Sequence, residues 1–96
     1  MGQKAIRLGM DKTTGHSGYP PVVAVQASSN VMVNGKGAVR NGDAYKPHKK
    51  KKKPSHIGYA VSSSSVRING KSAQRAGDSN TCKDFASNGS SNVRFG

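Results

Sequence analysis

A chain of 96 residues with 32% hydrophobic residues and no Trp can form one small domain at most, with a thin core. Its single Cys excludes an internal disulfide, so we expect a bound metal or a partner chain to stabilise it. The net charge of +12 keeps nucleic acid and anionic lipid among the conceivable partners. The longest apolar stretch is too short to span a membrane, and the first residues lack the apolar segment of a signal peptide. We therefore expect synthesis in the cytoplasm.

A unit of fifteen residues is repeated along the chain. Residues 29–43 read SNVMVNGKGAVRNGD and residues 64–78 read SSVRINGKSAQRAGD, with nine of fifteen positions identical. A third copy is divided between the two ends of the chain, because residues 91–96 repeat the start of the unit and residues 7–11 repeat its end with one extra residue. Repetition of this kind predicts three similar substructures within a single domain of residues 1–96.

Each unit predicts a β-hairpin followed by a second turn. Apolar residues alternate with others before Asn34-Gly35 and Asn69-Gly70, and Asn-Gly is the preferred pair for a type I′ turn. Each unit then closes with Arg-x-Gly-Asp, or Arg-x-x-x-Asp in residues 7–11, in which we expect the aspartate to pair with the arginine or cap the turn. No run of helical periodicity is present, so the fold class is predicted to be all-β.

A basic loop, residues 46–54, follows the first complete unit. Five consecutive lysines, Lys49 to Lys53, lie between Pro47 and Pro54. Such a run can bind nucleic acid or anionic lipid, or it can be a solvated loop without a partner. No aromatic residue alternates with the lysines, so the loop does not resemble a stacking platform for single strands.

The three histidines and the one cysteine all lie at the junctions of the repeats. His16, His56 and Cys82 are each followed three residues later by an aromatic residue, and His48 lies at the base of the basic loop. Three nitrogens and one sulfur suit tetrahedral zinc best and iron less well. The spacing matches no zinc-finger pattern, so the alternative of ordinary surface histidines stays open on spacing alone.

An enzymatic role is not expected from these residues. Of the four carboxylates, Asp11, Asp43 and Asp78 fall in the repeat turns, which leaves only Asp84. Four protein ligands on one zinc ion would close its coordination shell, as in structural rather than catalytic sites. Catalysis by Cys82 with a histidine is the weaker alternative.

The chain resembles the PAAR-repeat proteins, which form the pointed tips of type VI secretion spikes and of contractile phage tail spikes. The resemblance rests on the Val-x-Val/Ile-Asn-Gly-Lys runs at residues 31–36 and 66–71, and on the Gly-Asp pairs that close both units. The motif that names the family, Pro-Ala-Ala-Arg, is replaced here by Gly-Ala-Val-Arg at residues 37–40 and Ser-Ala-Gln-Arg at residues 72–75.

The resemblance implies a small cone of short β-hairpins with pseudo-threefold symmetry and a metal at the vertex. In the family three His and one Cys hold this zinc, which corresponds here to His16, His48, His56 and Cys82. The base of the cone would cap a trimeric β-helical spike, one tip per trimer. The residues expected on that side are Val31, Val33, Val66, Ile68, Val93 and Phe95. The alternative, that these six residues simply form the core, stays open.

The function expected from the resemblance is structural. No residue follows Gly96 in the sequence, so we expect no attached effector domain, which favours a membrane-piercing tip in a phage tail baseplate of the virion. Such a tip would touch the target envelope only transiently and would take no small-molecule substrate. The alternatives are a type VI secretion tip that carries effectors and, less favoured, a basic zinc module that binds nucleic acid.

Overall fold

The computed structural model describes residues 2–16, 18–48 and 55–95. Its strands are short and contain two residues each: β1 (Gln3–Lys4), β2 (Met32–Val33), β3 (Lys36–Gly37), β4 (Arg67–Ile68), β5 (Lys71–Ser72) and β6 (Arg94–Phe95). The described ranges contain no helix, which confirms the predicted all-β class. Accordingly, no helix in them has the length and apolar character to cross a membrane.

Two of the three two-stranded sheets are the predicted hairpins. β2 pairs with β3, and β4 pairs with β5, both antiparallel. The two-residue turns have positive φ at both positions, 53° and 81° at Asn34 and Gly35, and 54° and 79° at Asn69 and Gly70. Positive φ at both positions is what a type I′ turn requires, so the Asn-Gly pairs form the turns that the sequence predicts.

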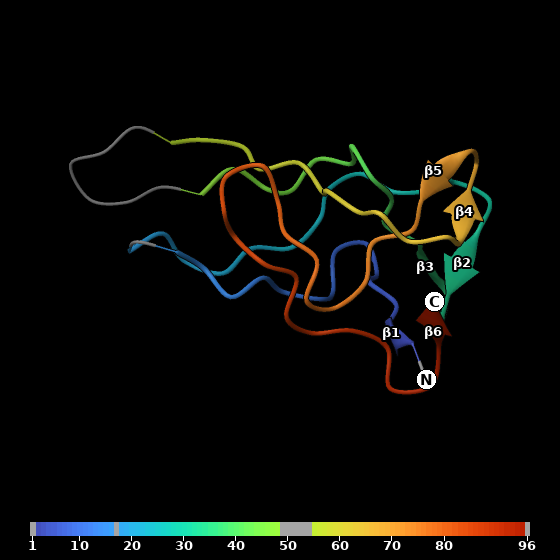
Figure 1. Cartoon of the computed structure of the whole chain (residues 1–96). Coiled ribbons are helices and arrows are strands. Elements are labelled where there is room, and N and C mark those ends of the chain that lie inside the picture. The colour runs from blue at the N-terminus through green and yellow to red at the C-terminus, as the bar shows by residue number, and fades with distance from the viewer. Residues whose placement is uncertain (1, 17, 49–54, 96) are drawn as a thin grey trace.

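The third hairpin is built from the two ends of the chain. β1 pairs with β6, with Gln3 opposite Phe95 and Lys4 opposite Arg94. In the repeat, Phe95 corresponds to Val33, which lies opposite Lys36 in the β2–β3 hairpin. The two pairs of strands therefore have the same register. Figure 1 shows all six strands and both chain ends gathered at the same end of the molecule.

Next to the hairpins, the three units pair with one another in a closed cycle. Arg7 is bridged to Ala38, Arg40 to Ala73, and Ala5 to Arg75, which returns to the first unit. The three alanines of this cycle are 0% exposed, because the three units pack together around them. The cycle gives the chain its pseudo-threefold axis.

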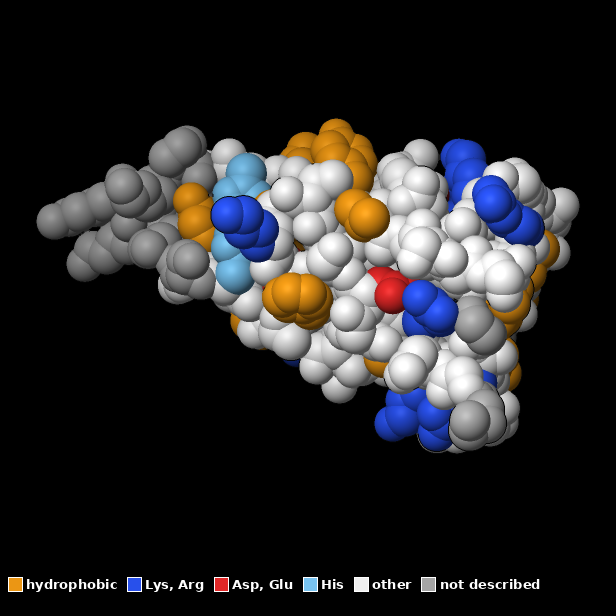
Figure 2. All heavy atoms as spheres, in the orientation of Figure 1, with side chains coloured by type: hydrophobic (Ala, Val, Ile, Leu, Met, Phe, Trp, Pro, Cys, Tyr) orange, Lys and Arg blue, Asp and Glu red, His pale blue; other side chains and the backbone are white. Residues whose placement is uncertain are grey.

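Beyond this cycle, six extended segments form a second closed ring. The backbone bridges connect residues 12 and 23, 24 and 45, 44 and 59, 60 and 80, 79 and 85, and 86 and 13, so that the last segment returns to the first. The described part of the molecule tapers along its long axis from the hairpin end toward the histidines (Figure 2). It is a cone of short hairpins, as the resemblance implies.

Two hydrophobic clusters fill the interior. The cluster inside the cone contains Ile6, Val22, Ala24, Val39, Tyr45, Ala60 and Ala86. The cluster at the wide end contains Ala5, Val33, Ala38, Ile68 and Ala73, with Val31, Val66, Val93 and Phe95 packed half-buried against it. All six residues expected on the partner side therefore belong to the wide-end cluster. Their contact with a partner stays a prediction.

The predicted Arg–Asp pairs are present in all three units. Arg7 pairs with Asp11 at 2.7 Å, Arg40 with Asp43 at 2.9 Å, and Arg75 with Asp78 at 3.1 Å. In each unit the aspartate also accepts a hydrogen bond from the backbone N–H of the same arginine. Each aspartate therefore both pairs with its arginine and closes the turn, so the two expected roles are combined.

Candidate metal centre

The four predicted ligands lie together at the narrow end of the cone. The Nε2 atom of His16 is 3.3 Å from that of His48 and 3.1 Å from that of His56, and the last two are 2.6 Å apart. Cys82 Sγ lies 3.9 Å from His48 Nε2. One ligand atom from each residue falls within 4.8 Å of all the others, so the group could hold one metal ion.

The hairpins of the second ring bring these four residues to the narrow end. His48 and His56 face each other across one hairpin, because the backbone N–H of each donates to the carbonyl oxygen of the other. His16 opens a tight turn that returns at Tyr19. Cys82 lies in the turn between Asn80 and Lys83, where Lys83 has a positive φ of 70°.

The second nitrogen of His48 is held by the backbone. His48 Nδ1 lies 2.9 Å from the carbonyl oxygen of Pro20, which can only accept a hydrogen bond. Nδ1 therefore carries the proton and leaves a lone pair on Nε2, the atom that points into the cluster. Such a contact to a carbonyl oxygen is the usual arrangement for a histidine that binds a metal.

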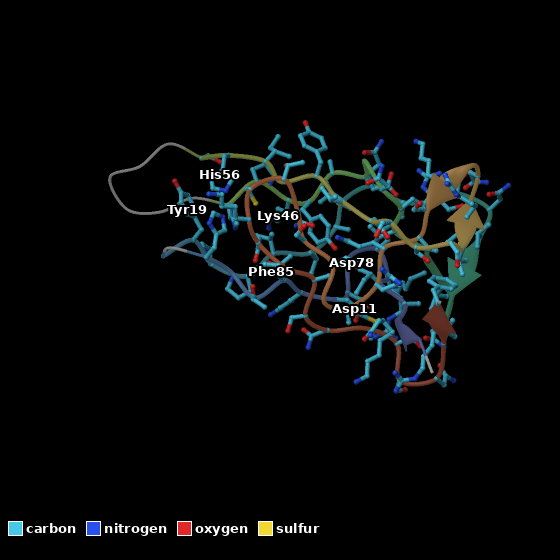
Figure 3. All side chains as sticks on the ribbon, viewed as in Figure 1. Asp11, Tyr19, Lys46, His56, Asp78 and Phe85 are labelled. Carbon is cyan, nitrogen blue, oxygen red and sulfur yellow. The ribbon has the colours of Figure 1, made fainter. Side chains whose placement is uncertain are left out.

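Tyr19 forms an aromatic wall against the histidines. Its ring centroid lies 5.0 Å from His16, 5.0 Å from His48 and 4.2 Å from His56. Figure 3 shows Tyr19 and His56 side by side at the narrow end. The ring restricts the orientations of all three imidazoles. The aromatic residues that follow His56 and Cys82 at the same spacing, Tyr59 and Phe85, are instead exposed by 43% and 48%.

A glycine provides the space for the sulfur of Cys82. A Cβ atom at Gly58 would lie 2.7 Å from Cys82 Sγ, closer than such atoms approach in proteins. Any larger residue at this position would push the sulfur out of place. The absence of a side chain at Gly58 therefore allows the Cys82 sulfur to occupy its position in the cluster.

The surroundings of His56 favour its neutral form. Desolvation lowers the pKa of His56, and the neighbouring His48 and His16 lower it further, while Asp84 opposes them. A neutral imidazole has a free lone pair and is the form that binds a metal, so the lowered pKa favours the form of His56 that can act as a ligand.

The geometry fits a tetrahedral ion of the zinc type. Zinc bonds of about 2.0–2.1 Å to nitrogen place two nitrogen ligands about 3.3–3.4 Å apart. The separations of 3.3 and 3.1 Å from His16 are close to this value, and the 2.6 Å pair must open by several tenths of an ångström. Three imidazoles and a thiolate are donors of the right chemical class.

The sequence predicted that these four residues lie together, but it did not predict the residues that surround them. The roles of Tyr19, the Pro20 carbonyl and Gly58 depend on contacts between segments, which no local pattern shows. The common spacing drew attention to Tyr19, but it did not distinguish Tyr19 from Tyr59 and Phe85, which share the spacing and are exposed. The lysines at 49–53 lie outside the residues that the structure describes.

Comparison with known proteins identifies the family. The family model of the PAAR motif matches residues 11–84, which include all four clustered residues. No curated protein matches the chain. The chain belongs to the PAAR-motif family, whose members are spike-tip proteins of the phage tail and type VI secretion kind, associated with a spike protein.

Proposed function

We propose that this protein is the membrane-piercing tip that caps the trimeric β-helical spike of a contractile phage tail baseplate. The observation that carries the proposal is the closed cycle that joins Arg7 to Ala38, Arg40 to Ala73 and Ala5 to Arg75. It gives one chain three similar faces, which is what a single chain needs to bind a threefold partner. The role is mechanical and requires no catalysed reaction.

The proposed docking surface is the wide end of the cone. Val33 and Ile68 are buried there, while Val31, Val66, Val93 and Phe95 are half-buried around them, and the three hairpins end on this side. An incompletely covered apolar cluster on a basic, polar protein is a surface that a partner would cover. The hairpin strands could also extend the β-structure of the spike through backbone pairing.

The proposed occupant of the vertex is a structural zinc ion held by His16, His48, His56 and Cys82. These ligands come from three different hairpins of the second ring. Because the interior clusters do not include residues of this end, there is little apolar burial to hold the hairpins together here. A bound zinc would join them, and iron is the less suitable metal for this ligand set.

The capping role can be tested by native mass spectrometry with the purified spike protein of the same particle. We expect one chain per spike trimer. Val66→Lys, in the wide-end cluster, should abolish the complex, whereas Val61→Lys on the side of the cone should preserve it, because Val61 is 41% exposed and lies outside both clusters. A stoichiometry of three chains per trimer, or equal effects of the two substitutions, would contradict the proposal.

A type VI secretion tip would share this fold and this vertex. The two functions are therefore distinguished by where the protein is found. Under the proposal, proteomics and immunogold labelling of purified virions should detect the protein at the distal end of the tail. Detection in secreted spike material that contains no virions would instead support the secretion machine.

A further inference from the structure

A groove on the narrow half of the cone is not explained by either the metal centre or the docking surface. It is lined by Lys12 and Lys46, by two valines and three prolines, and by His48. None of these residues belongs to the wide-end cluster. Figure 3 labels Lys46 in this half of the molecule.

The strands of the second ring explain how the two lysines come to flank an apolar surface. Lys12 is bridged to Val23, and the N–H of Lys46 donates to the carbonyl oxygen of Val23 at 2.9 Å. Val22 and Ala24 are buried, so Val23 between them points outward, and Lys12 and Lys46 are exposed on either side. A row of Lys, Val and Lys therefore crosses three neighbouring segments, with the prolines next to it.

The backbone of this groove offers few hydrogen bonds to a ligand. Pro20, Pro21 and Pro47 have no N–H group. The N–H groups of Lys46 and His48 are already donated within the protein. A peptide strand that bound by backbone pairing would therefore find few partners here, whereas a hydrocarbon chain needs none.

We propose that this groove binds an anionic phospholipid, with the phosphate between Lys12 and Lys46 and an acyl chain against Val23 and the prolines. The ligand must offer both negative charge and apolar surface, and a phospholipid offers both. Nucleic acid fits less well, because the lining contains no Phe, Tyr or Trp on which a base could stack. The inference goes beyond the proposed function, since a tip can pierce a bilayer without binding a lipid.

The test is vesicle binding by the full chain purified with its metal. Lys49→Ser through Lys53→Ser are introduced in every sample, so that the lysine run does not contribute. Lys12→Gln with Lys46→Gln is compared with Lys36→Gln and Lys71→Gln on β3 and β5 at the wide end. Both pairs remove the same charge, and melting curves confirm that each variant folds.

We expect the groove pair to weaken binding to phosphatidylglycerol vesicles by about tenfold or more, and the wide-end pair by less than about threefold. Part of the parent's binding should survive high salt, which screens the charges and leaves the apolar contact. Lys12→Arg with Lys46→Arg should preserve binding.

Equal weakening by the two lysine pairs, or complete loss of binding in high salt, would show attraction to net charge alone and overturn the inference. Tighter binding to duplex DNA or to an acidic peptide than to the vesicles would also overturn it. None of these outcomes affects the stoichiometry of the spike complex, so the capping role and the lipid site can fail independently.

Discussion

Gln3 and Phe95, near the two ends of the chain, are cross-strand partners in one hairpin. Their pairing matches that of Lys36 with Val33 and of Lys71 with Ile68, the residues that flank the two Asn-Gly turns. The ends of the chain therefore complete the third of three similar hairpins, and a single polypeptide acquires threefold character at its wide end.

This relationship predicts that a circular permutant will fold. We would join Phe95 to Gln3 through Asn-Gly and open the chain between Asn69 and Gly70. The new turn copies the two existing ones, so the permutant should melt within a few degrees of the parent. A second permutant with Ala-Ala at the junction should be about 2 kcal/mol less stable, because both positions require positive φ. Equal stability in urea unfolding would mean that the third junction is not a type I′ turn.

The Arg–Asp pairs predict a graded loss of stability. The Asp43 side chain is 1% exposed and that of Asp78 is 16% exposed, although the two occupy equivalent positions. Asp43→Ala leaves Arg40 without its partner in a buried setting and should cost about 3 kcal/mol. Asp78→Ala should cost about 1–2 kcal/mol, because solvent compensates more of the lost interaction. Urea midpoints measure both, and the reverse order would contradict the burial argument.

The space beside Gly58 predicts a specific loss of metal binding. Gly58→Ala places a methyl group 2.7 Å from Cys82 Sγ and should weaken zinc binding by about tenfold or more, as changes next to a ligand commonly do. Gly37→Ala is the matched control, because it introduces a similarly close contact away from the metal centre. Gly37 lies in the β2–β3 hairpin, and its Cβ would lie 2.5 Å from the Ser28 carbonyl oxygen. It should lower the melting temperature without changing zinc affinity in a chelator competition. Equal zinc affinities in the two variants would exclude the role assigned to Gly58.

Acid should destabilise the metal-free protein. Folding lowers the pKa of His56, so below the ordinary histidine pKa of about 6.5 the unfolded chain binds a proton more readily than the folded one. Stability therefore falls as the pH decreases through about 6.5 and is regained as it rises. His56→Gln should give a shallower dependence of melting temperature on pH between about 7 and 5. Identical slopes for the two proteins would contradict this account.

The sequence predicted what is local or repeated, and it missed what depends on pairing between distant segments. The Asn-Gly turns are determined by their own two residues, and the Arg–Asp pairs span only three or four positions. The clustering of the three histidines and Cys82 was predictable because the repeats place similar residues at similar points. The closed ring of six segments was not predicted, since its bridges join residues up to 73 positions apart, as between Thr13 and Ala86. Gln74, fully buried at the position equivalent to Ile6 and Val39, was missed for the same reason: its partners Tyr45 and Asn80 come from other segments.

The most direct test of the account is the metal content of the purified native protein, measured by mass spectrometry beside a Cys82→Ser variant. We predict one zinc ion per chain in the parent, its loss in the variant, and a sharply lower melting temperature for the variant and for the chelated parent. A parent without stoichiometric metal, or one that melts at the same temperature after chelation, would contradict a metal-stabilised vertex.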